Sequence, residues 1–186
     1  MATKTVTTWK SKKFYQIVAP ENFECRELGD TFASEPESLN GRTVNVSLGE
    51  LLDDRGKNYM NILFEIFDVK GDKAHTRFKE FFIPVGYLRS KVRKRTYKID
   101  YRKSLNFSDR KLSVKIMVLT RHKVSKEQTV EIKAKMASVL AEHGKEDADK
   151  FIQQTLFGKL GTDIYKRIKQ ICPIMRVEVY GINVRD

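Results

Sequence analysis

The part of this chain best suited to chemistry is a run of cations at residues 87–103, YLRSKVRKRTYKIDYRK. Eight of its side chains are Lys or Arg, opposed by the single acid Asp100. Cations at this density repel one another unless phosphate or another polyanion lies nearby, so the run predicts a docking surface for nucleic acid. The alternative is a solvated helix face whose charges bind nothing specific. The cations of the predicted surface are Arg89, Lys91, Arg93, Lys94, Arg95, Lys98, Arg102 and Lys103.

A second group of cations lies in the N-terminal arm, residues 1–13. This segment is polar and basic, with Trp9 as its only large apolar side chain, and such a composition cannot fold alone. Trp9 either stacks on a base or anchors the arm against the core. We expect the arm to become ordered on assembly and to add Lys10, Lys12 and Lys13 to the nucleic-acid surface.

The sequence offers no residues for catalysis. Its acids lie in polar segments typical of helix caps, and its three histidines lack the spacing of a metal site. The glycines at 158 and 161 lack the spacer of a phosphate loop, and the two cysteines have no partner spacing. We therefore predict a protein that is not an enzyme and has no cofactor, metal or small-molecule substrate.

Composition extends the basic character to the whole chain. The 186 residues include 36 Lys and Arg against 24 Asp and Glu, with a formal net charge of +12 and a pI near 9.7. Nucleic acid is the commonest partner of such a protein, and an acidic membrane surface is the rival. A spanning helix and a secretory signal are both absent from the sequence, so we expect an intracellular protein without a membrane partner.

The cations of the central run need a helix and a strand to hold them. Val85, Leu88 and Val92 recur three and four residues apart, which is the spacing of one helical face. Residues 97–101 then alternate apolar and polar side chains as a strand does, and residues 112–118 alternate again in a returning strand. The run is therefore predicted to be mounted on structure.

The remaining pattern predicts an α+β fold. Residues 59–69 and 74–83 form a hairpin, residues 27–40 suit a loop because of their Gly, Pro and acids, and residues 175–184 form a last strand. A capping box at Ser125 opens a helix with Val130 in its apolar stripe, and Thr162 or Asp163 caps a later one. We predict a largely antiparallel sheet or open barrel built from hairpins, with helices mainly in the C-terminal third, as one domain over residues 14–186.

RNA is favoured over DNA as the partner. The chain lacks a helix-turn-helix with a polar recognition face, a zinc module and a basic zipper, and reading the shape of structured RNA needs none of these. Aromatic side chains among the cations can stack on unpaired bases, although at a period of two they are more often core residues. These aromatics are Trp9, Tyr15, Tyr87, Tyr97 and Tyr101.

Several segments, in order along nearly the whole chain, resemble the small-subunit ribosomal protein 3a family of archaea and eukaryotes, and the length is like that of archaeal members. The segments that carry the resemblance are FYQIVAP, LNGRTVNVSLGEL, the VRKR run, FGKLGTDI and CPIMRVEV. The resemblance implies a structural constituent of the small ribosomal subunit in the cytoplasm. It would lie on the platform near the messenger exit and contact ribosomal RNA and neighbouring small-subunit proteins.

Two rival functions stay open at this point. The first is a non-ribosomal RNA chaperone or RNA-processing factor, which would cycle on and off RNA and be found mostly outside ribosomes. The second is an RNA-modifying enzyme, which would turn over an RNA substrate and lose this activity on a single acidic or His substitution.

Overall fold

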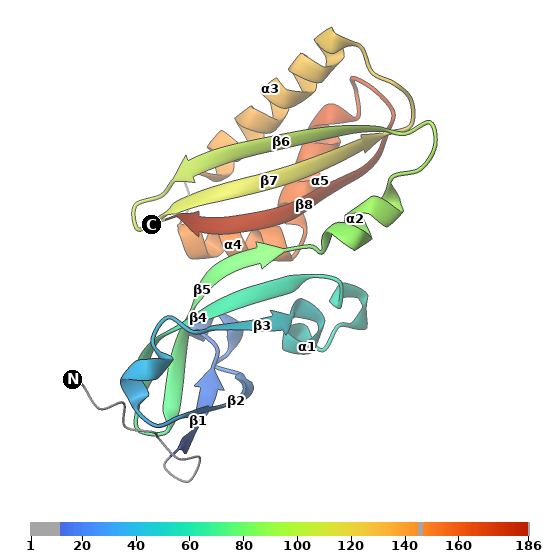
Figure 1. Ribbon diagram of the computed structural model, residues 1–186. Helices are drawn as coiled ribbons and strands as arrows, with labels where there is room; N and C mark the ends of the chain where they lie inside the picture. Colours follow the sequence, from blue (N-terminus) through green and yellow to red (C-terminus); the bar gives the residue numbers. More distant parts are fainter. Residues whose placement is uncertain (1–11, 145–146, 186) are drawn as a thin grey trace, which may run out of the picture. The chain divides into compact units, whose positions relative to one another are not determined.

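The structure, a computed structural model, describes residues 12–144 and 147–185, which form two compact units (Figure 1). The described part of the first unit comprises residues 12–58 and 62–79, and that of the second comprises residues 59–61, 80–144 and 147–185. Most of the predicted N-terminal arm, including Trp9 and Lys10, lies outside the described residues. The division of the chain into an arm and one domain stays a prediction.

The first unit is built on strands that enclose a small apolar core. Strand β1 pairs antiparallel with β2 and parallel with β5, and β4 pairs with both β3 and β5. Core side chains come from β1, β2, β4 and β5, with Leu39 from a short 3-10 turn. The strands are β1 (Lys13–Val18), β2 (Glu27–Ala33), β3 (Thr43–Ser47), β4 (Asn61–Lys70) and β5 (Lys73–Phe82), and helix α1 spans Leu48–Leu52.

The loop predicted over residues 27–40 is wrong for its first half, which forms β2. This strand ends the strand order of the sheet and pairs with β1 alone. An edge strand faces solvent, so it tolerates acids such as Asp30 that would be costly in a central strand. Gly29, with φ of +132°, lies beside an irregularity in the β1–β2 register and supplies a backbone conformation that other residues rarely adopt.

The second unit is a sheet with its long helices on one face. The end of β5, then β8, β7 and β6 follow one another, and each neighbouring pair is antiparallel. Helix α3 packs on β6 and α5 on β8, and Figure 1 shows α3, α4 and α5 behind the strands. The elements are α2 (Val85–Lys91), β6 (Tyr97–Asn106), β7 (Lys111–Thr120), α3 (Lys126–His143), α4 (Ala148–Leu156), α5 (Lys159–Ile168) and β8 (Ile174–Arg185).

The predicted α+β class, with a mostly antiparallel open sheet and late helices, is confirmed. The capping box is present, because the Ser125 hydroxyl accepts from the Gln128 N–H and the Gln128 side chain accepts from the Ser125 N–H. The predicted stripe of α3 is wrong at Val130, which is 68% exposed. The cap at Thr162 or Asp163 is also wrong, because α5 begins at Lys159 after Gly158.

Glu65 gives the first unit a testable pH dependence. Its carboxylate accepts from Lys79 at 2.8 Å and from Arg77 at 2.9 and 3.0 Å. The hydrogen bond from Lys79, helped by Arg77 and opposed by partial burial, holds the pKa of Glu65 below its ordinary value of 4.5. A lowered folded-state pKa stabilises the fold above the unfolded pKa, and this contribution disappears as the pH falls through the folded pKa.

We expect Glu65→Gln to lower the free energy of unfolding at pH 7, with the difference from the parent shrinking as the pH falls below about 4.5. Urea unfolding between neutral pH and about pH 3 measures this. Glu21→Gln, at an exposed position of the same unit, is the control and should show little difference at any pH. A Glu65→Gln difference that persisted in acid would contradict the role of the ionised carboxylate.

Candidate nucleic-acid interface

The cations of β6 divide between the two faces of the sheet in the second unit. Lys103 faces the helices, because its Nζ donates to the Ala137 carbonyl oxygen of α3 at 3.4 Å. Side chains alternate along a strand, so Lys98 and Arg102 lie on the opposite face. Residues paired directly across strands share a face, which adds cations of β7 and β8 to this surface. We call it the basic face, and its sheet cations are Lys98, Arg102, Lys111, Lys115, Arg176 and Arg185.

Tyr87 holds helix α2 against β8. Its ring stacks on that of Tyr59 with centroids 4.0 Å apart and planes at 8°, and Lys91 Nζ lies 4.4 Å from the Tyr87 ring centroid. Arg176 of β8 lies beside Tyr87 and pairs with Glu178 at 2.8 Å. Burial, followed by the nearby Glu178 carboxylate, raises the pKa of Tyr59. The basic helix is thus anchored through its aromatic side chain.

The predicted apolar face of α2 is only partly buried. Leu88 is buried, whereas Val85 and Val92 are 60% and 39% exposed. The helix is only seven residues long and is buried at its middle, at Leu88. Val85 and Val92 lie at its two ends, away from this contact, and are therefore exposed. The spacing correctly predicted a helix here, but the anchor is Tyr87 together with Leu88.

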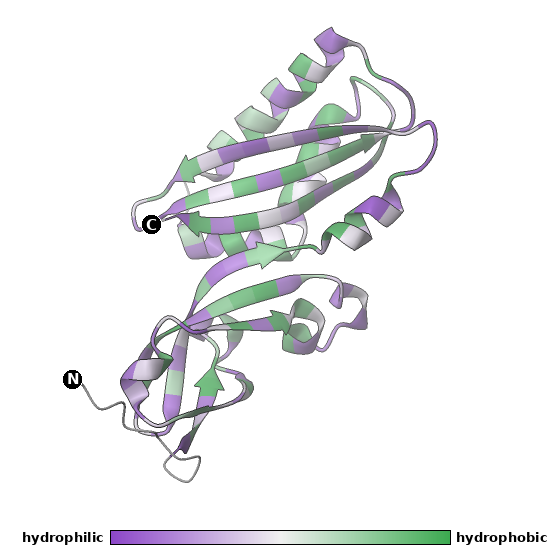
Figure 2. Cartoon of the chain, in the orientation of Figure 1, coloured by the Kyte–Doolittle hydropathy of each residue, from purple (hydrophilic) through white to green (hydrophobic). Residues whose placement is uncertain are grey.

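A tight turn between α2 and β6 carries three consecutive cations. The Thr96 N–H and hydroxyl both donate to the Arg93 carbonyl oxygen, at 3.2 and 2.7 Å, and the Thr96 hydroxyl accepts from the Arg93 N–H at 3.2 Å. Arg95 has a φ of +69°, which is uncommon for any residue except glycine. Arg93, Lys94 and Arg95 are all exposed on this turn, which is strongly hydrophilic in Figure 2.

Some cations of the surface are already neutralised and others are not. Lys98 pairs with Asp100 at 2.8 Å, and the Arg102 Nε donates to the Ser113 hydroxyl at 3.1 Å. A charge that already has a partner gains less from a phosphate than one held only by water. Within the part of the chain that the structure describes, the exposed cations of residues 89–103 without an ion pair or side-chain hydrogen bond are Arg89, Arg93, Lys94 and Arg95. Lys111 and Arg185 of the basic face are exposed and unpaired there as well.

The predicted set is therefore only partly brought together. The cations from Arg89 to Arg102 lie on α2, the turn and the basic face, whereas Lys103 lies on the helix-covered face. Lys12 and Lys13 are exposed in the first unit, and Lys10 lies outside the described residues.

Sequence reasoning missed the cations of β7 and β8. Lys115 joins Arg102 and Arg176 joins Lys98 on the basic face only through strand register, which no local pattern encodes. Tyr180 was also missed: burial, followed by the Asp100 carboxylate, raises its pKa, so this tyrosine lies among the β6 charges.

The aromatics predicted to stack on bases mostly have other roles. Tyr15 is 4% exposed and belongs to the core of the first unit. Tyr101 is half-buried, with a pKa raised by that burial, and Tyr87 stacks on Tyr59. Tyr97 is 39% exposed and keeps an accessible ring.

The positive φ of Arg95 predicts that stability and binding change in opposite directions on one substitution. In Arg95→Gly, relief of the left-handed conformation offsets the entropy cost of glycine, so we expect the free energy of unfolding to be unchanged or to rise by up to about 1 kcal/mol. The slope of log affinity for RNA against log salt concentration should become shallower by roughly one unit, because one phosphate contact is lost. Urea unfolding and RNA titration at several salt concentrations measure the two effects.

Lys94→Gly is the matched control for Arg95→Gly. It removes the same charge at a neighbouring position whose φ is not positive, so it should lose about 0.5–1 kcal/mol of stability. Equal stability losses in the two variants would show that Arg95 carries no backbone strain.

Within the described residues, no group of three or more His, Cys, Asp and Glu side chains could hold a metal ion. None of the described helices has the length and apolar composition that a membrane crossing requires. The features that remain are a fixed turn of free cations and a partly neutralised basic face, a combination typical of surfaces that bind the phosphate backbone.

Comparison with known proteins shows the family of the chain. The chain belongs to the Ribosomal S3Ae family, whose pattern it matches over residues 1–186. It is 36% identical over 179 residues to the small ribosomal subunit protein eS1 of Methanobrevibacter smithii, covering 95% of this chain and 93% of that protein. It is 35% identical over 187 residues to the protein of the same name from Archaeoglobus fulgidus, covering 98% of this chain and 89% of that protein. The resemblance seen in the sequence is confirmed.

Proposed function

We propose that this protein is a structural constituent of the small ribosomal subunit, without enzymatic activity, that binds ribosomal RNA through α2, the turn after it and the basic face. Membership of the Ribosomal S3Ae family supports a place in the ribosome. The relatives named small ribosomal subunit protein eS1 support a place in its small subunit. By the same resemblance its place is the platform near the messenger exit, in the cytoplasm, beside other small-subunit proteins.

The observation that carries the RNA part of the proposal is the turn Arg93–Thr96. Its cations are exposed, consecutive and without described partners, while the Thr96 hydrogen bonds fix the backbone that holds them. Lys and Arg presented on a fixed scaffold position a protein on the phosphate backbone at a lower entropy cost than flexible ones. The basic face then extends the positive surface along the sheet.

Sedimentation of a gently prepared native lysate on a sucrose gradient tests the proposal. We expect the chain to co-migrate with small subunits at near-unit stoichiometry, both at low salt and at roughly half-molar salt, where exposed charge pairs are strongly screened. Recovery at the top of the gradient, or loss from subunits in modest salt, would overturn it in favour of an RNA chaperone or processing factor.

A further inference from the structure

One edge of β8 has no neighbouring strand along part of its length. On one side β8 pairs with β7 along its length, whereas on the other β5 reaches only residues 181–183, followed by one hydrogen bond from the Ile83 N–H to the Tyr180 carbonyl oxygen. Register irregularities at residues 175 and 180 bound a regular edge of four residues, 176–179. In the part of the chain that the structure describes, no strand covers this edge.

The peptide groups of Val177 and Val179 point away from β7. The Arg121 N–H donates to the Pro173 carbonyl oxygen at 3.1 Å, so the odd-numbered residues of β7 direct their peptide groups towards β8. Val177 lies opposite the even-numbered Val118, so its own peptide groups point away from β7. Peptide groups alternate sides along a strand, so those of Val179 point the same way. No described backbone group hydrogen-bonds these N–H and C=O groups across this edge.

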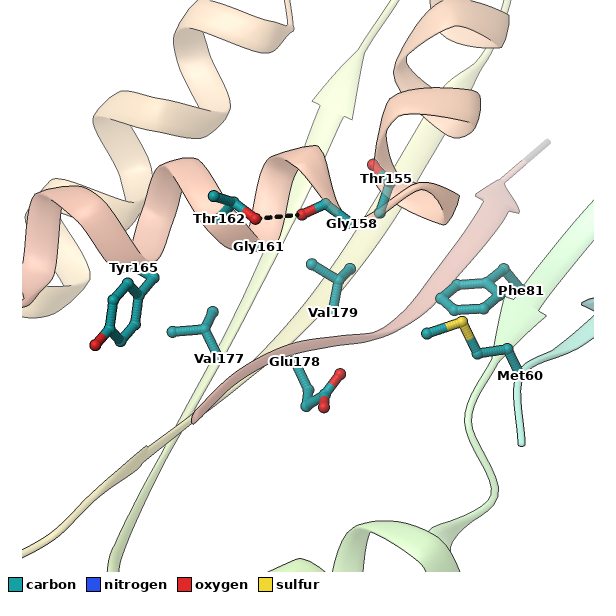
Figure 3. Close-up of a pocket in the computed structure, with 10 residues that line it drawn as sticks. All are labelled: Met60, Phe81, Thr155, Gly158, Gly161, Thr162, Tyr165, Val177, Glu178 and Val179. Atoms are coloured by element: carbon teal, nitrogen blue, oxygen red, sulfur yellow. Dashed lines mark hydrogen bonds between the residues drawn. The ribbon is translucent and has the colours of Figure 1, made fainter. Parts of the chain in front are cut away.

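A pocket of about 260 Å³ lies beside this edge (Figure 3). Met60 and Phe81 lie together at one end and Tyr165 at the other, while Val177 and Val179 project towards α5. The residues facing it along α5 follow helical spacing, and two of them are glycines whose missing side chains leave the space open. These α5-side residues are Gly158, Gly161, Thr162 and Tyr165.

Three of the polar side chains of the pocket, those of Thr155, Thr162 and Glu178, are already engaged. The Thr155 and Thr162 hydroxyls donate to carbonyl oxygens of their own helical turns, at 2.8 and 3.0 Å. Glu178 points away from α5 in Figure 3 and pairs with Arg176 at 2.8 Å. Among the described residues, the free polar groups at the pocket are therefore the Tyr165 hydroxyl at one end and peptide N–H and C=O groups in the geometry of a strand edge.

We infer that this edge and pocket dock a short extended segment of a neighbouring protein, which adds a strand to β8 and places an apolar side chain in the pocket. The N–H and C=O groups of Val177 and Val179 need partners spaced as in a neighbouring strand. An extended peptide backbone has N–H and C=O groups at this spacing, whereas nucleic acid has none. Exposed Lys169 continues the α5 row one turn beyond Tyr165, so an acidic residue beside the apolar anchor complements this end. The inference rests on the proposed function for the source of the segment, another protein of the small subunit.

Cross-linking in small subunits isolated from cells that carry a tagged chain tests this. A photoreactive benzoylphenylalanine replaces Tyr165, which is 40% exposed and already aromatic. We expect a cross-link to one protein of the subunit, mapped by mass spectrometry to a segment with an apolar residue next to an acid. Cross-links to RNA, to a second copy, to residues 1–11 of this chain, or none in subunits that contain the chain would overturn the inference.

Gly161 supplies the matched pair of variants. Gly161→Leu fills the pocket and should lower the cross-link yield about tenfold, as expected for loss of one anchoring contact. Gly161→Ala adds a Cβ that meets Val177 at an ordinary contact distance and should leave the yield within about twofold. An equal yield in both variants, each still present in subunits, would overturn the inference.

Hydrogen exchange of the parent chain gives a measurement that needs no pocket variant. The Val177 and Val179 amides should exchange at least about tenfold more slowly in the subunit than in the free protein, because a docked strand would accept their hydrogen bonds. If the chain is present in subunits but the exchange rates of these amides are unchanged, strand addition is overturned while the proposed function still stands. Absence of the parent chain from small subunits would instead overturn the proposed function, and with it the partner inferred here.

Discussion

Replacing Arg93, Lys94 and Arg95 together with Gln should weaken binding to small-subunit ribosomal RNA by on the order of 100-fold at about 0.1 M salt. Each lost phosphate contact removes about 0.7–0.9 units from the slope of log affinity against log salt, so the slope should fall by roughly two to three units. Filter binding at four or more salt concentrations measures both quantities. The large effect is expected because these side chains have no described partner that competes with phosphate.

The control for this variant removes three exposed cations from the other side of the sheet. Lys123, Lys126 and Lys133 lie before or on α3, which packs on the helix-covered face of β6. Their replacement with Gln changes the net charge of the protein by the same amount. An equal loss of affinity in both triple variants would mean that net charge, and not the turn, drives binding, and an unchanged slope would remove the turn from the interface.

The sequence predicted those elements whose signals are local. The capping box at Ser125 and the alternation along β6 and β7 are decided within a few residues, and the structure has all of them. The turn itself was not predicted: the run was assigned to a helix followed by a strand, whereas Arg93, Lys94 and Arg95 lie on the connection between α2 and β6. Local rules cannot show that Thr96 fixes this turn or that Arg95 adopts a positive φ.

What the sequence could not predict depends on contacts between distant segments. Strand β2 carries acids because it is an edge, and an edge is defined only by which strand is missing beside it. The rotation of α3, with Ile132 buried and Val130 exposed, follows from what the helix packs on. Lys115 and Arg176 join the basic face through pairing register. In each case a non-local partner outweighs the local pattern.

Two phenylalanines six residues apart, Phe151 and Phe157, show how helical geometry determines the contribution of a side chain to folding stability. Phe151 of α4 is 1% exposed, with its ring centroid 5.3 Å from that of Phe107, whereas Phe157 at the end of the same helix is 63% exposed. Six residues at 3.6 per turn place the second ring well away from the buried stripe of the first, which continues through Thr155.

Phe151→Ala should therefore lower the free energy of unfolding by about 3–5 kcal/mol, because it leaves a cavity in a packed core as well as losing buried area. Phe157→Ala should cost less than about 1 kcal/mol, as exposed substitutions usually do. Urea unfolding followed by far-UV circular dichroism is suited to this pair, because the three longest described helices, α3, α4 and α5, all belong to the second unit. Similar losses in the two variants would contradict the burial of Phe151 against Phe107.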